Sequence, residues 1–196
     1  MTSLTLPLVF DLSHVHLSDE QFYQLCINNP DIPLERNAQG ALIVMSPVGG
    51  ESGNYEMEFG TDLGIWNRQT QLGKVFSSST LFKLPGGGDR SPDVAWVELS
   101  RWQALTPEQR QKFPPIAPDL VIELRSRTDK LETLRQKMSE YMHSGVRLAW
   151  MFNPQDQQVE IYPQGQEKEI RQLPTELSGG EVLPGFVLKV DPFGDD

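Results

Sequence analysis

Two carboxylates stand at positions where the surrounding apolar sequence makes a negative charge costly. Asp93 follows Pro92 and directly precedes the apolar run Val94–Val97, and Glu123 interrupts the apolar run Leu120–Leu124. An ionised carboxylate in such a run must be paired, hydrogen-bonded or bound to a metal, because unpaired burial is strongly unfavourable. If the two runs are neighbouring strands, the two side chains can approach to within ~5 Å. Two oxygen ligands at that separation suit Mg²⁺, which binds one or two carboxylates and keeps several waters.

A metal ion held in this way would lower the pKa of a bound water and neutralise charge that develops on a phosphate oxygen. The alternative is structural, with Glu123 forming an internal ion pair with Arg125 or Lys137 and holding no metal. The spacing alone leaves both interpretations open.

Basic side chains cluster just after the second carboxylate. From Arg125 to Lys137 there are five cations and two anions, a local charge of +3 in a chain whose net charge is −10. Helical spacing places Lys137 at the edge of the apolar stripe Leu134–Tyr141, beside the sheet and within reach of Glu123. A lysine there can orient or deprotonate a water, whereas Arg125 can stabilise an anion but not act as a base. Alternatively, Lys137 lays its aliphatic stem along the core and extends its ammonium into water.

The elements that must position these residues predict an α/β or α+β domain with a mixed sheet flanked by helices. Apolar spacing predicts a helix over about residues 51–69. A second helix is expected to be capped by Asp129 with Glu132 and to end at Gly145. The expected core strands are Lys74–Ser79, Leu81–Leu84, Val94–Val97, Leu120–Arg125 and Leu148–Phe152.

Further elements flank this core, which we place at about residues 51–154. They are a helix that begins after Ser18, a hairpin of Leu34–Arg36 with Ala41–Met45, a hairpin of Gln158–Tyr162 with Glu169–Leu173, and a last strand over Val187–Val190. We assign residues 1–196 to a single domain, with N-terminal additions over residues 18–47 and C-terminal additions over residues 158–190.

Composition narrows the classes of protein. A chain of 196 residues with 22% charged side chains is typical of one soluble domain. The net charge of −10 argues against general polyanion binding, so a nucleic acid would need a local basic patch. Cys26 is the only cysteine, which excludes an internal disulfide and fits a reducing compartment. The sequence predicts neither a signal peptide nor a membrane span, so we expect a cytoplasmic protein.

Two other constellations carry less weight. His14 and His16 lack a third zinc ligand nearby in the sequence. The hydroxyls of Ser77–Thr80 lack an adjacent base, so nucleophilic catalysis is not expected there.

Several motifs, taken in their order along the chain, resemble a known family. They are ERNAQGALIVMSP from Glu35 to Pro47, Ser91-Pro92-Asp93, PDLVIELRS from Pro118 to Ser126, Lys137-Met138 with Glu140-Tyr141 and Gly145, Asn153-Pro154, and Leu183-Pro184-Gly185-Phe186. Over nearly the whole chain, this pattern resembles the Uma-two restriction-endonuclease family, a bacterial branch of the PD-(D/E)XK nuclease superfamily. The resemblance implies a restriction-endonuclease-like core of helix, three strands, helix and strand.

The resemblance also implies a metal centre. Asp93 and Glu123 would hold Mg²⁺ or Mn²⁺, helped by the backbone carbonyl of Leu124. The superfamily pattern has a lysine two positions after the second acid, where this sequence has Arg125. The resemblance therefore points to Lys137 on the following helix as the catalytic lysine, with Arg125 as an electrostatic contributor.

Members of the family tend to carry an acid at the start of the first core helix. Glu51 fits that position best and would be a third metal ligand, while Glu58 and Asp62 are alternatives on roughly the same side of the helix. The structural interpretation of Glu51 is a negative charge favoured by the helix dipole.

Two functional hypotheses from different classes follow. The first is a Mg²⁺-dependent endonuclease that hydrolyses phosphodiester bonds of DNA. The sequence does not fix its oligomeric state, but the resemblance points to a homodimer, since many nucleases of that superfamily act as dimers to cut two strands. The second is a catalytically inactive nuclease fold kept as a binding or assembly module, which Arg125 and the acidic composition favour. Metal-dependent cleavage of DNA distinguishes the two.

Overall fold

The structure, a computed structural model, describes residues 6–12 and 14–194. The strands are β1 (Leu8–Phe10), β2 (Leu34–Arg36), β3 (Leu42–Val44), β4 (Gly73–Ser77), β5 (Phe82–Lys83), β6 (Asp89–Arg90), β7 (Val94–Glu98), β8 (Leu120–Leu124), β9 (Leu148–Asn153), β10 (Gln158–Pro163), β11 (Glu169–Gln172), β12 (Thr175–Ser178) and β13 (Val187–Val190). The helices are α1 (Asp19–Asn28), α2 (Gly50–Thr70), α3 (Leu99–Ala104), α4 (Pro107–Gln111), α5 (Leu131–His143) and the 3₁₀ helix η1 (Pro154–Asp156).

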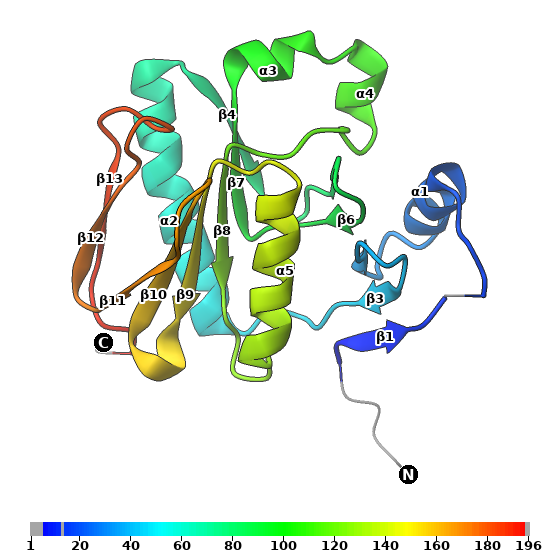
Figure 1. Ribbon diagram of the computed structural model, residues 1–196, viewed down its shortest axis with the longest axis horizontal. Coiled ribbons are helices and arrows are strands. Elements are labelled where there is room, and N and C mark those ends of the chain that lie inside the picture. The colour runs from blue at the N-terminus through cyan, green and yellow to red at the C-terminus, as the bar shows by residue number, and fades with distance from the viewer. Residues whose placement is uncertain (1–5, 13, 195–196) are drawn as a thin grey trace.

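A six-stranded mixed sheet forms the centre of the molecule. Its strand order is β11-β10-β9-β8-β7-β4, in which β8 runs parallel to β9 and antiparallel to β7. Helices α2 and α5 lie on opposite sides of this sheet (Figure 1), and the small β12-β13 ribbon lies on the same side as α2. The expected mixed sheet flanked by helices is therefore confirmed.

The side chains of β8 alternate between the two faces of the sheet, as strand geometry requires. Leu120 and Ile122 pack in an apolar cluster with Phe59 and Leu63 of α2. Val121 belongs to a separate cluster that covers the other face.

That other face is covered by α5. Leu134, Met138 and Tyr141 of this helix pack against Val121 and its neighbours on β9. Because alternate residues share a face, Glu123 points to the same side as Val121 and therefore toward α5. The alternation thus directs a carboxylate into a region that is otherwise apolar.

A second sheet, with the order β1-β3-β2-β6-β5, lies beside the main one. Its strand β2 pairs with β6 through Arg36 and Asp89, and β6 ends three residues before Asp93. Helix α1 covers this sheet and begins with the expected capping box, in which Ser18 and Gln21 exchange side-chain and backbone hydrogen bonds. The N-terminal elements are thereby attached next to the start of β7.

Most predicted elements are confirmed, including both hairpins, α2 and the central strands. The prediction that Asp129 caps α5 is wrong. Its carboxylate instead accepts a hydrogen bond from the N–H of Ser126 within the preceding turn, and the helix begins at Leu131 after Lys130, which provides no side-chain cap. The predicted end of α5 is confirmed, since Gly145 adopts φ +96° just beyond it.

Five short elements were not expected from the sequence: β1, β6, β12, α3 and η1. None of the described helices combines the length and the apolar character needed to cross a membrane.

Candidate active site

Asp93 and Glu123 meet across two antiparallel strands. The pairing of β7 with β8 sets Val94 opposite Ile122, and the same register, continued by one residue, sets Asp93 opposite Glu123. The Asp93 carboxylate accepts a 2.6 Å hydrogen bond from the backbone N–H of Leu124. This bond holds the aspartate at the end of β8, next to the glutamate.

Helix α5 brings two polar side chains to the glutamate. The Nζ of Lys137 lies 2.8 Å from Oε1 and 3.0 Å from Oε2 of Glu123. The hydroxyl of Tyr141 donates a 2.7 Å hydrogen bond to Oε1. Lys137 and Tyr141 are four residues apart and so share one side of the helix. The structure thus brings Asp93, Glu123 and Lys137 together, and adds Tyr141, which apolar spacing assigned only to the buried stripe.

A second glutamate, absent from the sequence-based selection, completes the surroundings of the lysine. Glu35 of β2 is 1% exposed, and its Oε1 lies 3.1 Å from the Nζ of Lys137. The Glu35 carboxylate also accepts hydrogen bonds from Nη1 of Arg90 at 2.8 Å and from the N–H of Ser91 at 2.9 Å. Lys137 donates in addition to the carbonyl of Ser91 at 3.3 Å. The ammonium therefore donates hydrogen bonds to Glu123 and to the Ser91 carbonyl and forms an ion pair with Glu35.

Burial dominates the electrostatics of the two facing carboxylates. It raises the pKa of Asp93 to about 7, with a further rise from the negative charge of Glu56, against the opposing influence of Lys137 and the N–H of Leu124. Burial likewise raises the pKa of Glu123 to about 8, and the neighbouring Asp93 adds to the rise while Lys137 opposes it. Both carboxylates are therefore short of compensating positive charge.

The lysine and the second glutamate are perturbed in the opposite sense. Burial alone would lower the pKa of Lys137, but the charges of Glu123 and Glu35 outweigh it and raise the pKa above its ordinary value. Burial alone would raise the pKa of Glu35, but Lys137 and Arg90 outweigh it and the net pKa is lowered. Lys137 is consequently an ammonium and Glu35 a carboxylate at neutral pH.

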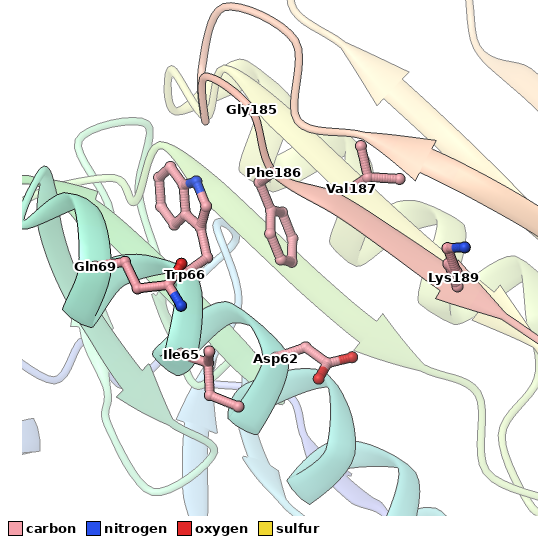
Figure 2. Close-up of a pocket in the computed structure, with 8 residues that line it drawn as sticks. All are labelled: Asp62, Ile65, Trp66, Gln69, Gly185, Phe186, Val187 and Lys189. Atoms are coloured by element: carbon pink, nitrogen blue, oxygen red, sulfur yellow. The ribbon is translucent and has the colours of Figure 1, made fainter.

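The acids proposed for the first core helix do not join this cluster. Glu51 is exposed in the first turn of α2 and forms no hydrogen bond or ion pair within the described ranges. Glu58 is exposed and accepts a hydrogen bond from Asn54. Asp62 is exposed as well, and Figure 2 shows it in a different depression, between α2 and β13, together with Lys189.

Glu56 is the acid of α2 whose charge interacts with Asp93 and Glu123. Burial raises its pKa, the charge of Glu123 raises it further, and a hydrogen bond with Ser78 opposes the shift. It lines the same groove as Asp93. A helical signal for it exists in the sequence, because Glu56 precedes the buried Leu63 by seven residues and so lies on nearly the same side of α2.

Arg125 is directed away from the cluster. Its Nη1 donates to the amide oxygen of Asn153 at 3.1 Å, and its Nε donates to the carbonyl of Asp129 at 3.2 Å. The arginine thus ties the loop after β8 to the end of β9. Arg125 forms no hydrogen bond or ion pair with Glu123 or Asp93 in the described part of the chain.

Comparison with known proteins adds a family to this geometry. The sequence matches the family Uma2, described as "Putative restriction endonuclease", over residues 19–191. The chain belongs to the Uma2 family. The resemblance found in the sequence motifs is confirmed by this match.

A solved structure shares the fold of this Uma2 chain. It is the crystal structure of a "putative nuclease belonging to DUF820" from Anabaena variabilis ATCC 29413, with a TM-score of 0.67 and 18% sequence identity. The likeness covers 81% of this chain and 88% of that one. Among curated proteins, no match to the Uma2 chain was found.

The donor set of the Uma2 chain fits a hard divalent cation. Asp93 has one hydrogen-bond donor among the described residues, at Oδ2, so its second oxygen stays available. Oε2 of Glu123 accepts one hydrogen bond and keeps a second acceptor position. No three His, Cys, Asp or Glu side chains of the described residues group as a metal site, which disfavours the zinc type. Two carboxylates with waters are sufficient for Mg²⁺ or Mn²⁺.

Proposed function

We propose that this protein is a metal-dependent endonuclease that hydrolyses phosphodiester bonds of DNA, with Mg²⁺ or Mn²⁺ as cofactor. One observation carries the proposal: Asp93 just before β7, Glu123 of β8 and Lys137 of α5 lie together in one cluster, in which Glu123 and Lys137 are buried. Membership of a family described as restriction endonucleases supports it.

A groove beside the cluster supports a polymeric substrate. It has a volume of about 360 Å³ and runs between α2 and the edge strand β4. Its lining residues include Gly53, Gly60, Gly64, Arg68, Val75, Phe76, Ser77, Ser78, Glu56 and Asp93. Glycines allow a close approach of a sugar–phosphate backbone, while an arginine and two hydroxyls are suitable partners for phosphate oxygens.

The carboxylates of Asp93 and Glu123 would hold the divalent cation. Bound there, the cation supplies an acidified water and neutralises charge on the phosphate in the transition state. Both carboxylates have raised pKa values in its absence, so a cation would stabilise their ionised forms. The sequence resemblance gave a third metal-binding acid at Glu51; we propose no third carboxylate ligand, and Glu56, whose charge raises the pKa of Asp93, lines the groove beside the two ligands.

Lys137 acts as a fixed positive charge in this proposal. Its raised pKa keeps it protonated, which disfavours the role of general base that the sequence left open. Its longest hydrogen bond, to the Ser91 carbonyl at 3.3 Å, is the one it can exchange most easily for a phosphate or water oxygen. It would then orient the attacking water or stabilise the developing charge on phosphorus-bound oxygens.

The first test is cleavage of supercoiled plasmid and of single-stranded DNA by the purified protein with Mg²⁺ or Mn²⁺. We expect Glu123→Gln to reduce the cleavage rate by ~10²-fold or more, because it removes a metal-binding charge while keeping the side-chain shape. Glu169→Gln, which changes an exposed carboxylate on β11, is the matched control and should cleave at the wild-type rate. Equal rates for wild type and Glu123→Gln would refute the proposal and favour a binding or assembly module.

Two further features belong to the proposal. We expect a homodimer, since a cut through both strands needs two centres. We also expect a cytoplasmic location, which the DNA substrate and the single thiol of Cys26 support.

A further inference from the structure

The N-terminal sheet contributes a side chain to the cluster that the main sheet and α5 build. Glu35 lies on β2, which pairs with β3 and β6 and not with the six-stranded sheet. Its carboxylate nevertheless reaches across to Lys137 at 3.1 Å. We infer that Glu35 is a positioning residue, which holds the ammonium of Lys137 in place for the proposed cleavage reaction.

The geometry of the ammonium supports this inference. Lys137 donates hydrogen bonds to Glu123 and to the carbonyl of Ser91, and its ammonium forms an ion pair with Glu35 at 3.1 Å. A long flexible side chain with one partner can rotate about four bonds, whereas three partners define one position. Glu35 is the only one of the three that is a charged group outside the proposed metal ligands.

A role restricted to neutralising Arg90 does not account for the position of Glu35. Arg90 already has a second carboxylate, since its Nη2 lies 2.7 Å from Glu140. The Oε2 of Glu35 is used by Arg90, while Oε1 is shared between Lys137 and the N–H of Ser91. The backbone of Ser91 in turn leads directly to Asp93, so the same carboxylate fixes both the lysine and the approach to the aspartate.

Glu35 has no place in the groove lining. Its loss should therefore lower the rate of the chemical step and leave DNA affinity nearly unchanged. Glu140 provides a matched control, because it contacts Arg90 but not Lys137. Glu140→Gln disturbs the same arginine without removing a partner of the ammonium.

The inference rests on the proposed nuclease activity, and two independent readouts test it. For Glu35→Gln we expect kcat to fall by ~10-fold or more with KM within ~2-fold of wild type, and for Glu140→Gln we expect both within ~2-fold. The second readout is the ¹H–¹⁵N signal of the Lys137 ammonium, assigned by its loss in Lys137→Met. A hydrogen-bonded, buried ammonium exchanges slowly enough to be observed, so the signal should persist in Glu140→Gln and disappear or shift in Glu35→Gln.

The outcomes separate the two proposals. If the wild type does not cleave DNA, the proposed function fails, and the ammonium signal alone still decides whether Glu35 positions Lys137. An unshifted signal in Glu35→Gln, or wild-type kcat in that variant, overturns the inference. If Glu35→Gln does not fold, Glu35→Asp keeps the charge but withdraws the carboxylate by one methylene. A shifted signal in Glu35→Asp then supports the inference, and an unshifted one overturns it.

Discussion

Two buried carboxylates of this protein have opposite electrostatic surroundings. Glu160 of β10 is fully buried and accepts hydrogen bonds from Arg135, Lys168 and Tyr162. Burial opposes ionisation, but these three donors outweigh it and lower the pKa to about 2. Glu123, with a pKa of about 8, has too little positive charge nearby. The charge of Glu160 is thus compensated within the protein, whereas that of Glu123 is not, which supports our proposal that Glu123 holds a cation.

The Glu160 cluster gives a prediction for acid stability. A lowered pKa in the folded state means that the stabilisation is complete above about pH 4.5 and is lost as the pH falls toward 2. The difference from the ordinary glutamate pKa corresponds to about 3 kcal/mol. We expect the free energy of unfolding of Glu160→Gln to lie below that of wild type at neutral pH by roughly this amount, and the gap to close at about pH 2. Urea unfolding followed by circular dichroism measures both.

Glu181→Gln is the control for this experiment. Glu181 is exposed and pairs with no cation in the described ranges, so its substitution should leave the free energy of unfolding unchanged at either pH. A gap between wild type and Glu160→Gln that stays constant with pH would contradict the prediction.

At the scale of single residues, the sequence predicted those charged site residues whose neighbours in the sequence are apolar. Asp93, Glu123 and Lys137 stand out because a charge interrupts an apolar pattern, and the structure brings the three together. Glu35 and Glu56 were missed. Helical spacing indicates the side of α2 on which Glu56 lies, but the partners of both acids are far away in the sequence, and no local pattern indicates which acid meets which distant side chain.

At the scale of elements, helix α2 lines the groove beside Asp93 with glycines, among them Gly60 and Gly64. A Cβ added at Gly64 would have no heavy atom within 4 Å, and one added at Gly60 would meet only Val94, at 3.7 Å. Core packing therefore does not require glycine at either position. Glycine inside a helix is costly because of its backbone entropy, so the open groove is a functional explanation for a feature that lowers stability.

This explanation gives a prediction at the scale of the helix. We expect Gly64→Ala to raise the free energy of unfolding by about 0.5–1 kcal/mol, since alanine favours the helix and meets open space. We expect Gly64→Leu to raise KM for DNA by several-fold, because a larger side chain narrows the groove. Gly50→Leu adds the same bulk at the start of α2, outside the lining of that groove and where an added Cβ has no heavy atom within 4 Å, and should leave KM unchanged. An unchanged KM in Gly64→Leu would show that the substrate does not use this groove.

The sequence predicted long elements better than short ones. Helix α2 and the central strands carry several apolar residues each, so their periodicity is readable. Strand β6 has two residues, too few to show an alternation of apolar and polar side chains. It forms because β2 and β5 pair with it. The false cap at Asp129 has a similar cause, since one carboxylate can serve either a helix start or the turn before it.

The whole molecule is acidic, with a net charge of −10, and its substrate in our proposal is a polyanion. Attraction at long range is therefore unfavourable, and contacts must come from local groups. Two copies that act on one duplex would double the number of these contacts. The proposed homodimer would thus provide a second centre for the second DNA strand and would compensate for the weak electrostatic attraction to DNA.

Sedimentation equilibrium tests the assembly. We expect a mass about twice that of the 22.1 kDa chain, and plasmid cleavage that yields linear product with little nicked circle. A mass equal to one chain, together with accumulation of nicked circles, would contradict the homodimer and indicate cuts in single strands.

The contact between Glu35 and Lys137 also has a consequence for biosynthesis. The ammonium leaves the ribosome long after Glu35, and Tyr141, which supports Glu123, follows later still. Until α5 has left the ribosome and packed against the sheet, Glu35 and Glu123 lack the ammonium of Lys137 as their partner. If the proposed cleavage of DNA is correct, its centre is thus completed only after most of the chain has been synthesised.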